Sequence, residues 1–225
     1  MISKEQGLIF VHIPKTAGTA LSMSVFAPPS GDPHIGIPDL RVFHKDVEWD
    51  SFTKFCFLRD PFDRFASTYK QLTSKKRIPE INHRLSHEHF RDFVLNYWAP
   101  MVKGESVGDV SDLGLVTWLR ENVIDAKYSA FNPNVYQSYL KESDGSLGVD
   151  YVLDFSRPRS QLELIDKKIK AQGKSGITDR ILFLREENPI RFNDFWDRET
   201  REVFREICKS DIEFYDELKK NAFSK

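Results

Sequence analysis

The sequence predicts an α/β fold, a three-layer α/β/α sandwich around a mostly parallel central sheet. Three apolar runs of strand length, at residues 8–13, 55–58 and 151–155, are each followed by a turn and then by a helical pattern. Repeated strand–turn–helix units are typical of parallel sheets that are covered by helices on both faces. The chain has 225 residues, so we expect a single domain over residues 1–225.

The first unit begins with Leu8–Ile13, an apolar and β-branched run. Pro14 ends this strand because proline has no N–H to donate to a sheet. The loop that follows consists almost entirely of small residues, and Gly18 within it can take backbone conformations that other residues rarely adopt. We therefore expect a tight loop with accessible backbone N–H groups, followed by a helix over residues 19–26.

This loop is the first candidate site. A strand, a small-residue loop and a helix start together direct several N–H groups and the positive end of the helix dipole toward one point. Lys15 adds a full positive charge, and the hydroxyls of Thr16 and Thr19 add two donors, which suits a phosphate or sulfate group. An ordinary strand-to-helix turn is the alternative interpretation of the same residues.

A short second strand is predicted over Leu40–Phe43, and His44 follows its carboxyl end. Ligands of open parallel sheets bind outside the carboxyl ends of the strands, so His44 is a candidate site residue. A lone histidine in such a place is also common as a structural residue.

A third strand, Phe55–Leu58, precedes a well-marked helix start, in which Asp60 suits the N-cap and Pro61 the first helical position. Helical spacing predicts a core stripe of Phe62, Phe65, Ala66, Tyr69 and Leu72. Ser67 lies roughly opposite this stripe, so we expect it to face away from the core. Arg59 and Ser67 can then hold a second phosphate, unless Arg59 instead pairs with a neighbouring carboxylate.

Composition excludes several classes of function. The 33 Lys and Arg residues nearly balance the 34 Asp and Glu residues, so the basic surplus of a nucleic-acid binder is missing. No apolar run is long enough to span a bilayer or to form a signal peptide. Cys56 and Cys208 are too few for a disulfide framework or a zinc site, and we interpret both as core residues. The basic stretch from Lys75 to Arg91 is either a rim for an anionic acceptor or a solvated helix face.

Two motifs carry a resemblance to a known family. The loop Pro14-Lys15-Thr16-Ala17-Gly18-Thr19 differs from the nucleoside triphosphate loop, in which the lysine follows the last glycine. It resembles the 5′-phosphosulfate loop of sulfotransferases that use 3′-phosphoadenosine 5′-phosphosulfate, particularly the carbohydrate branch of Golgi and heparan sulfate enzymes. The stretch RDPFDRFASTY, from Arg59 to Tyr69, resembles the 3′-phosphate motif of the same family.

The resemblance implies the P-loop nucleotide-binding type of fold found in sulfotransferases, in a soluble, cytoplasmic bacterial relative. It implies that Pro14–Ala20 binds the 5′-phosphosulfate of the donor and that Arg59 and Ser67 bind its 3′-phosphate. Lys15 would neutralise charge on the leaving oxygen. His44 would act as general base, with Asp46 or Glu48 as substitutes.

The same resemblance implies the substrates. 3′-Phosphoadenosine 5′-phosphosulfate is the expected donor, 3′-phosphoadenosine 5′-phosphate is the expected product, and no metal is expected to be required. The acceptor is expected to carry a free hydroxyl, with a saccharide favoured and a small alcohol, a phenol or a peptide tyrosine left open. We expect no nucleic-acid partner and no membrane span.

Two other functions remain open at this stage. A nucleotide kinase or related phosphotransferase would carry a later Lys-Ser/Thr pair and a metal-binding Asp at a strand end, and neither pattern is found. A non-catalytic nucleotide-binding module would keep the phosphate motifs but would need no base, so the role of His44 distinguishes it from an enzyme.

Overall fold

The computed structural model describes residues 1–26, 34–73, 89–107, 120–121, 128–181 and 192–222. The chain divides into two compact units. The first consists of Met1–Arg59, Tyr136–Ile190 and Tyr215–Lys225, and the second of Asp60–Val135 and Arg191–Phe214. The single domain expected over residues 1–225 stays a prediction.

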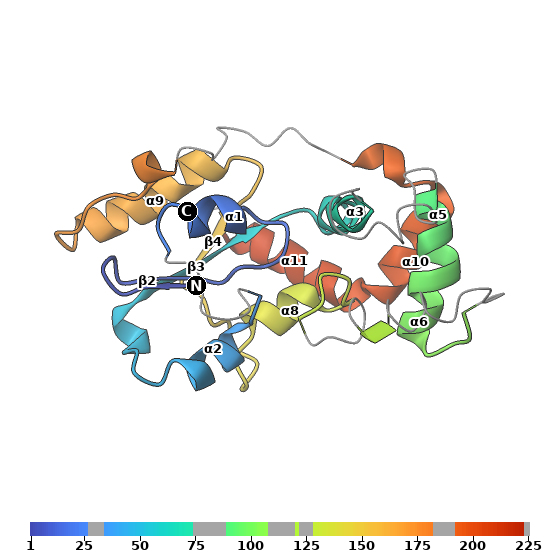
Figure 1. The fold of residues 1–225 in the computed structure, drawn as a ribbon, viewed down its shortest axis with the longest axis horizontal. Coiled ribbons are helices and arrows are strands. Elements are labelled where there is room, and N and C mark those ends of the chain that lie inside the picture. The colour runs from blue at the N-terminus through green and yellow to red at the C-terminus, as the bar shows by residue number, and fades with distance from the viewer. Residues whose placement is uncertain (27–33, 74–88, 108–119, 122–127, 182–191, 223–225) are drawn as a thin grey trace. The chain divides into compact units, whose positions relative to one another are not determined.

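The first unit is built on a four-stranded sheet in the order β1-β2-β3-β4 (Figure 1). The strands are β1 (Ile2–Ser3), β2 (Leu8–Phe10), β3 (Thr53–Leu58) and β4 (Tyr151–Asp154). β1 is antiparallel to β2, whereas β2, β3 and β4 are parallel, with Phe10 opposite Phe55 and Phe55 opposite Tyr151. The mostly parallel sheet is therefore confirmed, and the carboxyl ends of three strands lie at one edge of it.

Helices cover both faces of this sheet. The helical elements of the first unit are α1 (Gly18–Ser22), α2 (Ile37–Phe43), η1 (Trp49–Ser51), α9 (Pro158–Lys170) and η5 (Thr178–Arg180). The chain passes from one unit to the other within α8 (Val135–Leu140) and within α11 (Lys209–Ala222). α1 and α9 lie on one side of the sheet and α2 on the other (Figure 1), which confirms the predicted α/β layering.

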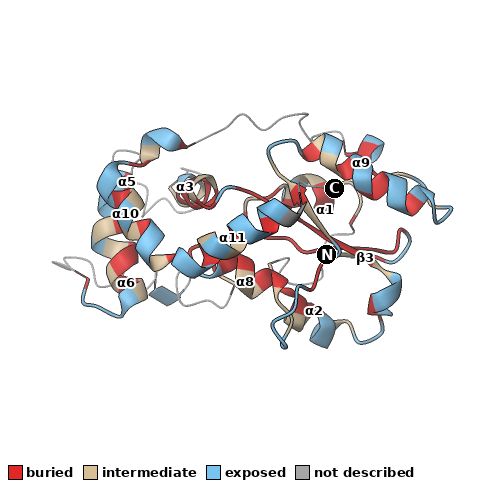
Figure 2. Cartoon of the chain, turned by 180° about the vertical axis from the view of Figure 1, so that it is seen from behind, coloured by how far each residue is buried: buried red, intermediate tan, exposed pale blue. Residues whose placement is uncertain are grey.

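The central strand β3 is buried along its whole length (Figure 2). A strand covered on both faces is expected to be apolar, as residues 55–58 are, whereas Thr53 and Lys54 at its start are polar. Phe55 and Phe57 share a core cluster with Leu21 of α1 and with Leu162 and Ile165 of α9. Cys56 and Cys208 are buried free cysteines, so their interpretation as core residues is confirmed.

The second unit contains α3 (Pro61–Leu72), α5 (Phe90–Asp92), the π-helix η3 (Phe93–Trp98), α6 (Ala99–Lys103), η6 (Asn193–Phe195) and α10 (Arg198–Ile207). The start of α3 is as predicted, because the Asp60 carboxylate accepts a 3.0 Å hydrogen bond from the Asp63 N–H. Phe65, Ala66 and Tyr69 are buried in an aromatic core, where the Phe65 ring lies 4.8 Å from that of Trp98. The predicted core stripe of α3 is confirmed.

The C-terminal part of the chain forms two consecutive helices. Asp197 caps α10 and forms a capping box with Thr200. Cys208 separates α10 from α11.

The predicted strand at 40–43 is wrong, because these residues belong to helix α2. Gly36 is the N-cap, and Pro38 lies in the first turn, where its fixed φ favours a helix. The buried residues are Ile37 and Leu40, three apart, whereas Val42 and Phe43 are 60% and 68% exposed. Apolar identity over four residues did not distinguish a strand from an exposed helix end.

Candidate functional site

The loop after β2 adopts a conformation suited to an anion. Lys15 and Ala17 have φ values of 72° and 64°, in the left-handed region that non-glycine residues rarely occupy. Each such residue costs about 1–2 kcal/mol, so the surrounding structure must hold the loop in place. The first backbone hydrogen bond of α1 runs from the Leu21 N–H to the Ala17 carbonyl. The N–H groups of residues 18–20 therefore precede any intrahelical acceptor and are oriented along the dipole of the helix start.

The two threonines of the loop differ in role. Thr16 is fully buried, and its hydroxyl donates a 2.7 Å hydrogen bond to the Ile13 carbonyl. Its single hydroxyl hydrogen thus stabilises the turn, which leaves the backbone N–H of Thr16 as its donor toward a ligand. Thr19 is exposed at the start of α1.

Arg59 lies beside this loop. It follows β3, is 7% exposed, and its Nη1 donates a 3.1 Å hydrogen bond to the Lys15 carbonyl. The guanidinium lies 5.2 Å from the centre of the Phe155 ring, and the Tyr136 hydroxyl donates to the Arg59 carbonyl. Arg59 is permanently charged, so two cationic residues meet at the carboxyl ends of β2 and β3.

Tyr136 and Ser67 are both buried. Tyr136 is fully buried, and its hydroxyl donates a hydrogen bond to the Arg59 carbonyl, so it stabilises the backbone of the site. Ser67 is only 8% exposed, so the expectation that it faces away from the core is wrong. It belongs to the second unit, and its joint binding of a phosphate with Arg59 stays a prediction.

Two histidines lie at the loop, and sequence reasoning did not assign either to the site. A Cβ atom placed on Gly18 would lie 1.8 Å from Nε2 of His12, so the edge of this imidazole stands directly against the glycine. The centre of the His34 ring lies 4.3 Å from that of His12. Only their positions in the sequence could have indicated a place at the site, because His12 lies between the strand and the loop, and His34 lies between the loop helix and α2.

His12 is held in its neutral form. Burial is the main cause that lowers its pKa to about 3, and the nearby charges of His34, the Met1 amino group and Lys15 contribute to the same shift. The imidazole is 7% exposed. An imidazole with this pKa is in its neutral form at neutral pH, so His12 adds an uncharged ring to the site.

The structure does not bring His44 to Lys15. His44 is the half-buried C-cap of α2, and residues on both sides of it are anchored at the opposite edge of the sheet. Asp46 forms a 2.6 Å ion pair with Lys4, in the turn before β2. Arg41 forms a 2.8 Å ion pair with Glu142, beside the start of β4. The base role predicted for His44 stays a prediction that this placement does not support.

The substitute bases share this location. The hydrogen bond from Lys4 lowers the pKa of Asp46, which makes its carboxylate a weaker proton acceptor. Glu48 is exposed and lies before η1, at the same edge.

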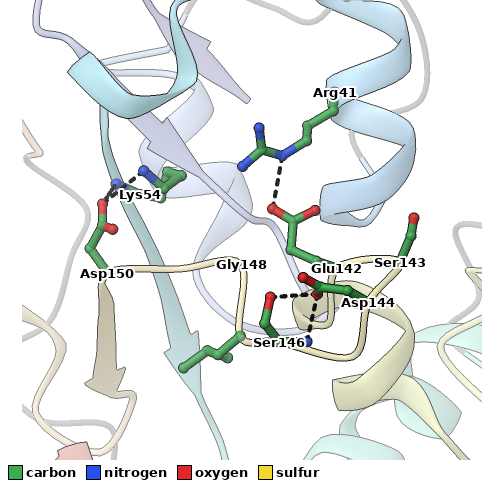
Figure 3. Close-up of a pocket in the computed structure, with 9 residues that line it drawn as sticks. Arg41, Lys54, Glu142, Ser143, Asp144, Ser146, Gly148 and Asp150 are labelled. Carbon is green, nitrogen blue, oxygen red and sulfur yellow. Dashed lines mark hydrogen bonds and ion pairs between the residues drawn. The ribbon is translucent and has the colours of Figure 1, made fainter.

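A polar cleft of about 450 Å³ occupies this opposite edge (Figure 3). Its charged side chains are paired within it: Arg41 with Glu142, and Lys54 with Asp150 at 3.2 Å. Asp144 accepts hydrogen bonds from the backbone and hydroxyl of Ser146. These internal pairs leave the cleft without the convergent charge found at the loop.

Part of the predicted basic stretch is described. Arg91 forms ion pairs with Asp197, at 2.6 Å, and with Glu199, so it serves the start of α10. Lys75, Lys76, Arg77 and Arg84 lie outside the described residues. Their predicted roles stay predictions.

Within the described ranges, no helix is both long and apolar enough to cross a membrane. Among the same residues, no group of three or more His, Cys, Asp or Glu side chains is arranged to hold a metal ion.

Comparisons with known proteins give one match. The model of the sulfotransferase family matches residues 37–217, a range that includes Arg59 and Ser67 and begins after the loop at Lys15. Neither the curated proteins nor the solved structures contain a match. Because the matched range spans more than half of its length, the chain belongs to the sulfotransferase family.

Proposed function

We propose that this chain transfers a sulfuryl group from 3′-phosphoadenosine 5′-phosphosulfate to an acceptor hydroxyl. Family membership supports sulfuryl transfer in general. The observation that carries the finer assignment is the 3.1 Å hydrogen bond between Arg59 and the Lys15 carbonyl, which joins the two predicted phosphate motifs at one sheet edge. Arg and Lys form strong charge-assisted hydrogen bonds with phosphate, and this contact brings one of each to the same sheet edge.

The loop would hold the 5′-phosphosulfate. The N–H groups of residues 18–20 and the helix start provide donors without a full charge, and Lys15 provides the charge. Arg59 would bind the 3′-phosphate, and the part of Ser67 in this binding stays a prediction. Pro14, Ala17 and Ala20 contribute no polar side chain, so their part is to shape the loop backbone.

The bound donor supplies the sulfuryl group. An acceptor oxygen forms its bond to sulfur while the bond from sulfur to the bridging oxygen breaks. Lys15 stabilises the negative charge that develops on that bridging oxygen. The proton of the acceptor hydroxyl must pass to a base near the loop.

We assign this base to His34 in place of the sequence-predicted His44. His34 lies against His12 beside the loop, whereas the neighbours of His44 are anchored at the other end of the strands. Histidine is the side chain that most often acts as a general base toward a hydroxyl. The acceptor is proposed to be a saccharide, and the enzyme is proposed to act in the cytoplasm.

The donor assignment predicts a ligand preference. 3′-Phosphoadenosine 5′-phosphate is expected to raise the melting temperature more than ATP with magnesium does. At a hundredfold excess over its dissociation constant, a ligand stabilises the native state by about 2.7 kcal/mol, or about 5–10 °C for a chain of this size. Thermal scans with each ligand measure this shift. A larger shift with ATP and magnesium would favour the phosphotransferase alternative.

The role of Arg59 gives a second prediction. Arg59→Ala is expected to weaken the binding of 3′-phosphoadenosine 5′-phosphate about 10–100-fold, because a hydrogen bond to a charged group is worth about 1.5–3 kcal/mol. Adenosine 5′-monophosphate lacks the 3′-phosphate, so its binding should be weakened less by this substitution, although the loop loses its support at Lys15. Calorimetric titration of both ligands gives the two dissociation constants.

Arg157→Ala is the matched control for this experiment. Arg157 follows β4 at the same sheet edge, but its side chain is 61% exposed and lies 3.9 Å from Asp154. Its replacement should leave both affinities near wild type. Equal weakening of the two nucleotides by Arg59→Ala would mean that Arg59 supports the loop and does not bind the 3′-phosphate.

A further inference from the structure

His12 occupies the space between the donor loop and the proposed base. On one side, its Nε2, Cε1 and Cδ2 atoms stand where any side chain on Gly18 would have to be. On the other side, its ring lies 4.3 Å from that of His34, at an interplanar angle of 39°. It also stacks on Phe10 of β2, with ring centres 5.7 Å apart. The imidazole is therefore packed between a rigid strand and two parts of the site.

The chemistry of His12 argues against a proton-transfer role. Its pKa of about 3 makes it a far weaker proton acceptor than an ordinary imidazole, so it is a poor base toward a hydroxyl. Among the residues that the structure describes, Nδ1 of His12 is buried and has no hydrogen-bond partner. The contribution of His12 is thus its flat, uncharged ring.

His34 needs such support. It lies outside any helix or strand, two residues before the N-cap of α2. Its carbonyl accepts a 3.4 Å hydrogen bond from the buried Tyr139 hydroxyl, which holds the backbone. The side chain is held at its ring by the contact with His12. One contact fixes where the residue lies, and the other fixes where its imidazole points.

We propose that His12 is a positioning residue of this enzyme: it seats the Gly18 turn of the donor loop and aligns the His34 imidazole over it. The proposal rests on the proposed function, because alignment matters only if His34 takes the acceptor proton. It assigns a use to Gly18 as well. A glycine is required at this position because the ring leaves no room for a Cβ atom.

Two variants of similar size separate this role from simple space filling. His12→Phe keeps a flat ring against His34, whereas His12→Leu keeps apolar volume but removes the plane. Turnover is expected to stay close to wild type in His12→Phe and to fall about 100-fold in His12→Leu, since misplacement of a catalytic group by about 1 Å has an effect of this size. Affinity for 3′-phosphoadenosine 5′-phosphate should stay close to wild type in both.

Three outcomes overturn the proposal. Normal turnover in both variants would mean that His12 only fills space. An equal loss in both, with product binding intact, would mean that the nitrogens of His12 are needed. A loss of nucleotide affinity in His12→Phe would make His12 a donor ligand. If wild type itself fails to bind 3′-phosphoadenosine 5′-phosphate, the donor assignment fails and not the packing of His12.

The packing is tested separately, without substrate. Gly18→Ala is expected to lower the melting temperature by about 2–10 °C, because an overpacked site must shift against the imidazole. In a His12→Ala background the same Gly18→Ala change should have little effect, since the ring that it strikes is gone. Equal destabilisation in both backgrounds would show that His12 does not seat the turn.

Discussion

Replacing His34 with alanine is expected to reduce turnover about 10²–10⁴-fold while leaving the affinity for 3′-phosphoadenosine 5′-phosphate nearly unchanged. General-base catalysis contributes a factor of this size when the proton acceptor is removed. The phosphates are proposed to be held by the loop and by Arg59, which this change does not touch. Transfer from sulfur-labelled donor to a panel of saccharide acceptors measures the turnover, and calorimetric titration measures the binding.

His44→Ala is the matched control, because it removes the histidine that the sequence pattern favoured. Turnover of this variant is expected to stay near wild type, since Arg41 and Asp46 anchor its neighbourhood at the far edge of the sheet. If His44→Ala abolishes turnover and His34→Ala does not, our assignment of the base is wrong. If neither variant loses turnover, Asp46 and Glu48 are the next candidates for the base.

The parts of the fold that the sequence predicted correctly are those in which local signals agree. Residues 55–58 are apolar throughout, and β3 is buried on both faces. Asp60 and Pro61 carry N-cap and first-turn chemistry, and α3 begins between them. In these places a few neighbouring residues determine the outcome, because capping and burial act over one or two turns.

The errors arise where tertiary packing decides. Val42 and Phe43 look like half of a strand, but they end a helix whose buried positions are Ile37 and Leu40. Ser67 lies opposite the main apolar stripe of α3, yet it is buried. A stripe predicted from one helix assumes one covered face, and a helix covered on several sides breaks that assumption.

The same difference between local signals and tertiary packing explains why the site was predicted only in part. Lys15 and Arg59 each follow a strand, and parallel strands that pair as neighbours bring their carboxyl ends together. His12 and His34 meet through a segment that carries no periodic pattern, so their 4.3 Å contact has no local signal. The hydroxyl of Thr16 was assigned to a ligand, but its nearest acceptor is the carbonyl of Ile13 in its own turn.

Lys15→Met is expected to lower turnover about 10²–10³-fold, the size of effect seen when one group that stabilises transition-state charge is removed. Methionine keeps the aliphatic stem and removes the ammonium. Both residues must adopt the φ of 72° found at this position, so the strain of the loop is similar in the two proteins. Affinity for the bisphosphate product should also fall, because the charge of Lys15 already faces the phosphate in the ground state.

This double loss distinguishes Lys15 from His34, for which only turnover should fall. Lys45→Met is the control, because it removes an exposed lysine beyond α2 and should change neither quantity. Normal turnover in Lys15→Met would exclude its proposed role at the bridging oxygen. If Lys15→Met lowers the nucleotide affinity but the wild-type protein transfers no sulfuryl group to any acceptor, the chain is instead a nucleotide-binding module. The pair of measurements therefore separates the enzyme from the module, because the two make the same phosphate contacts and differ only in whether Lys15 also serves a reaction.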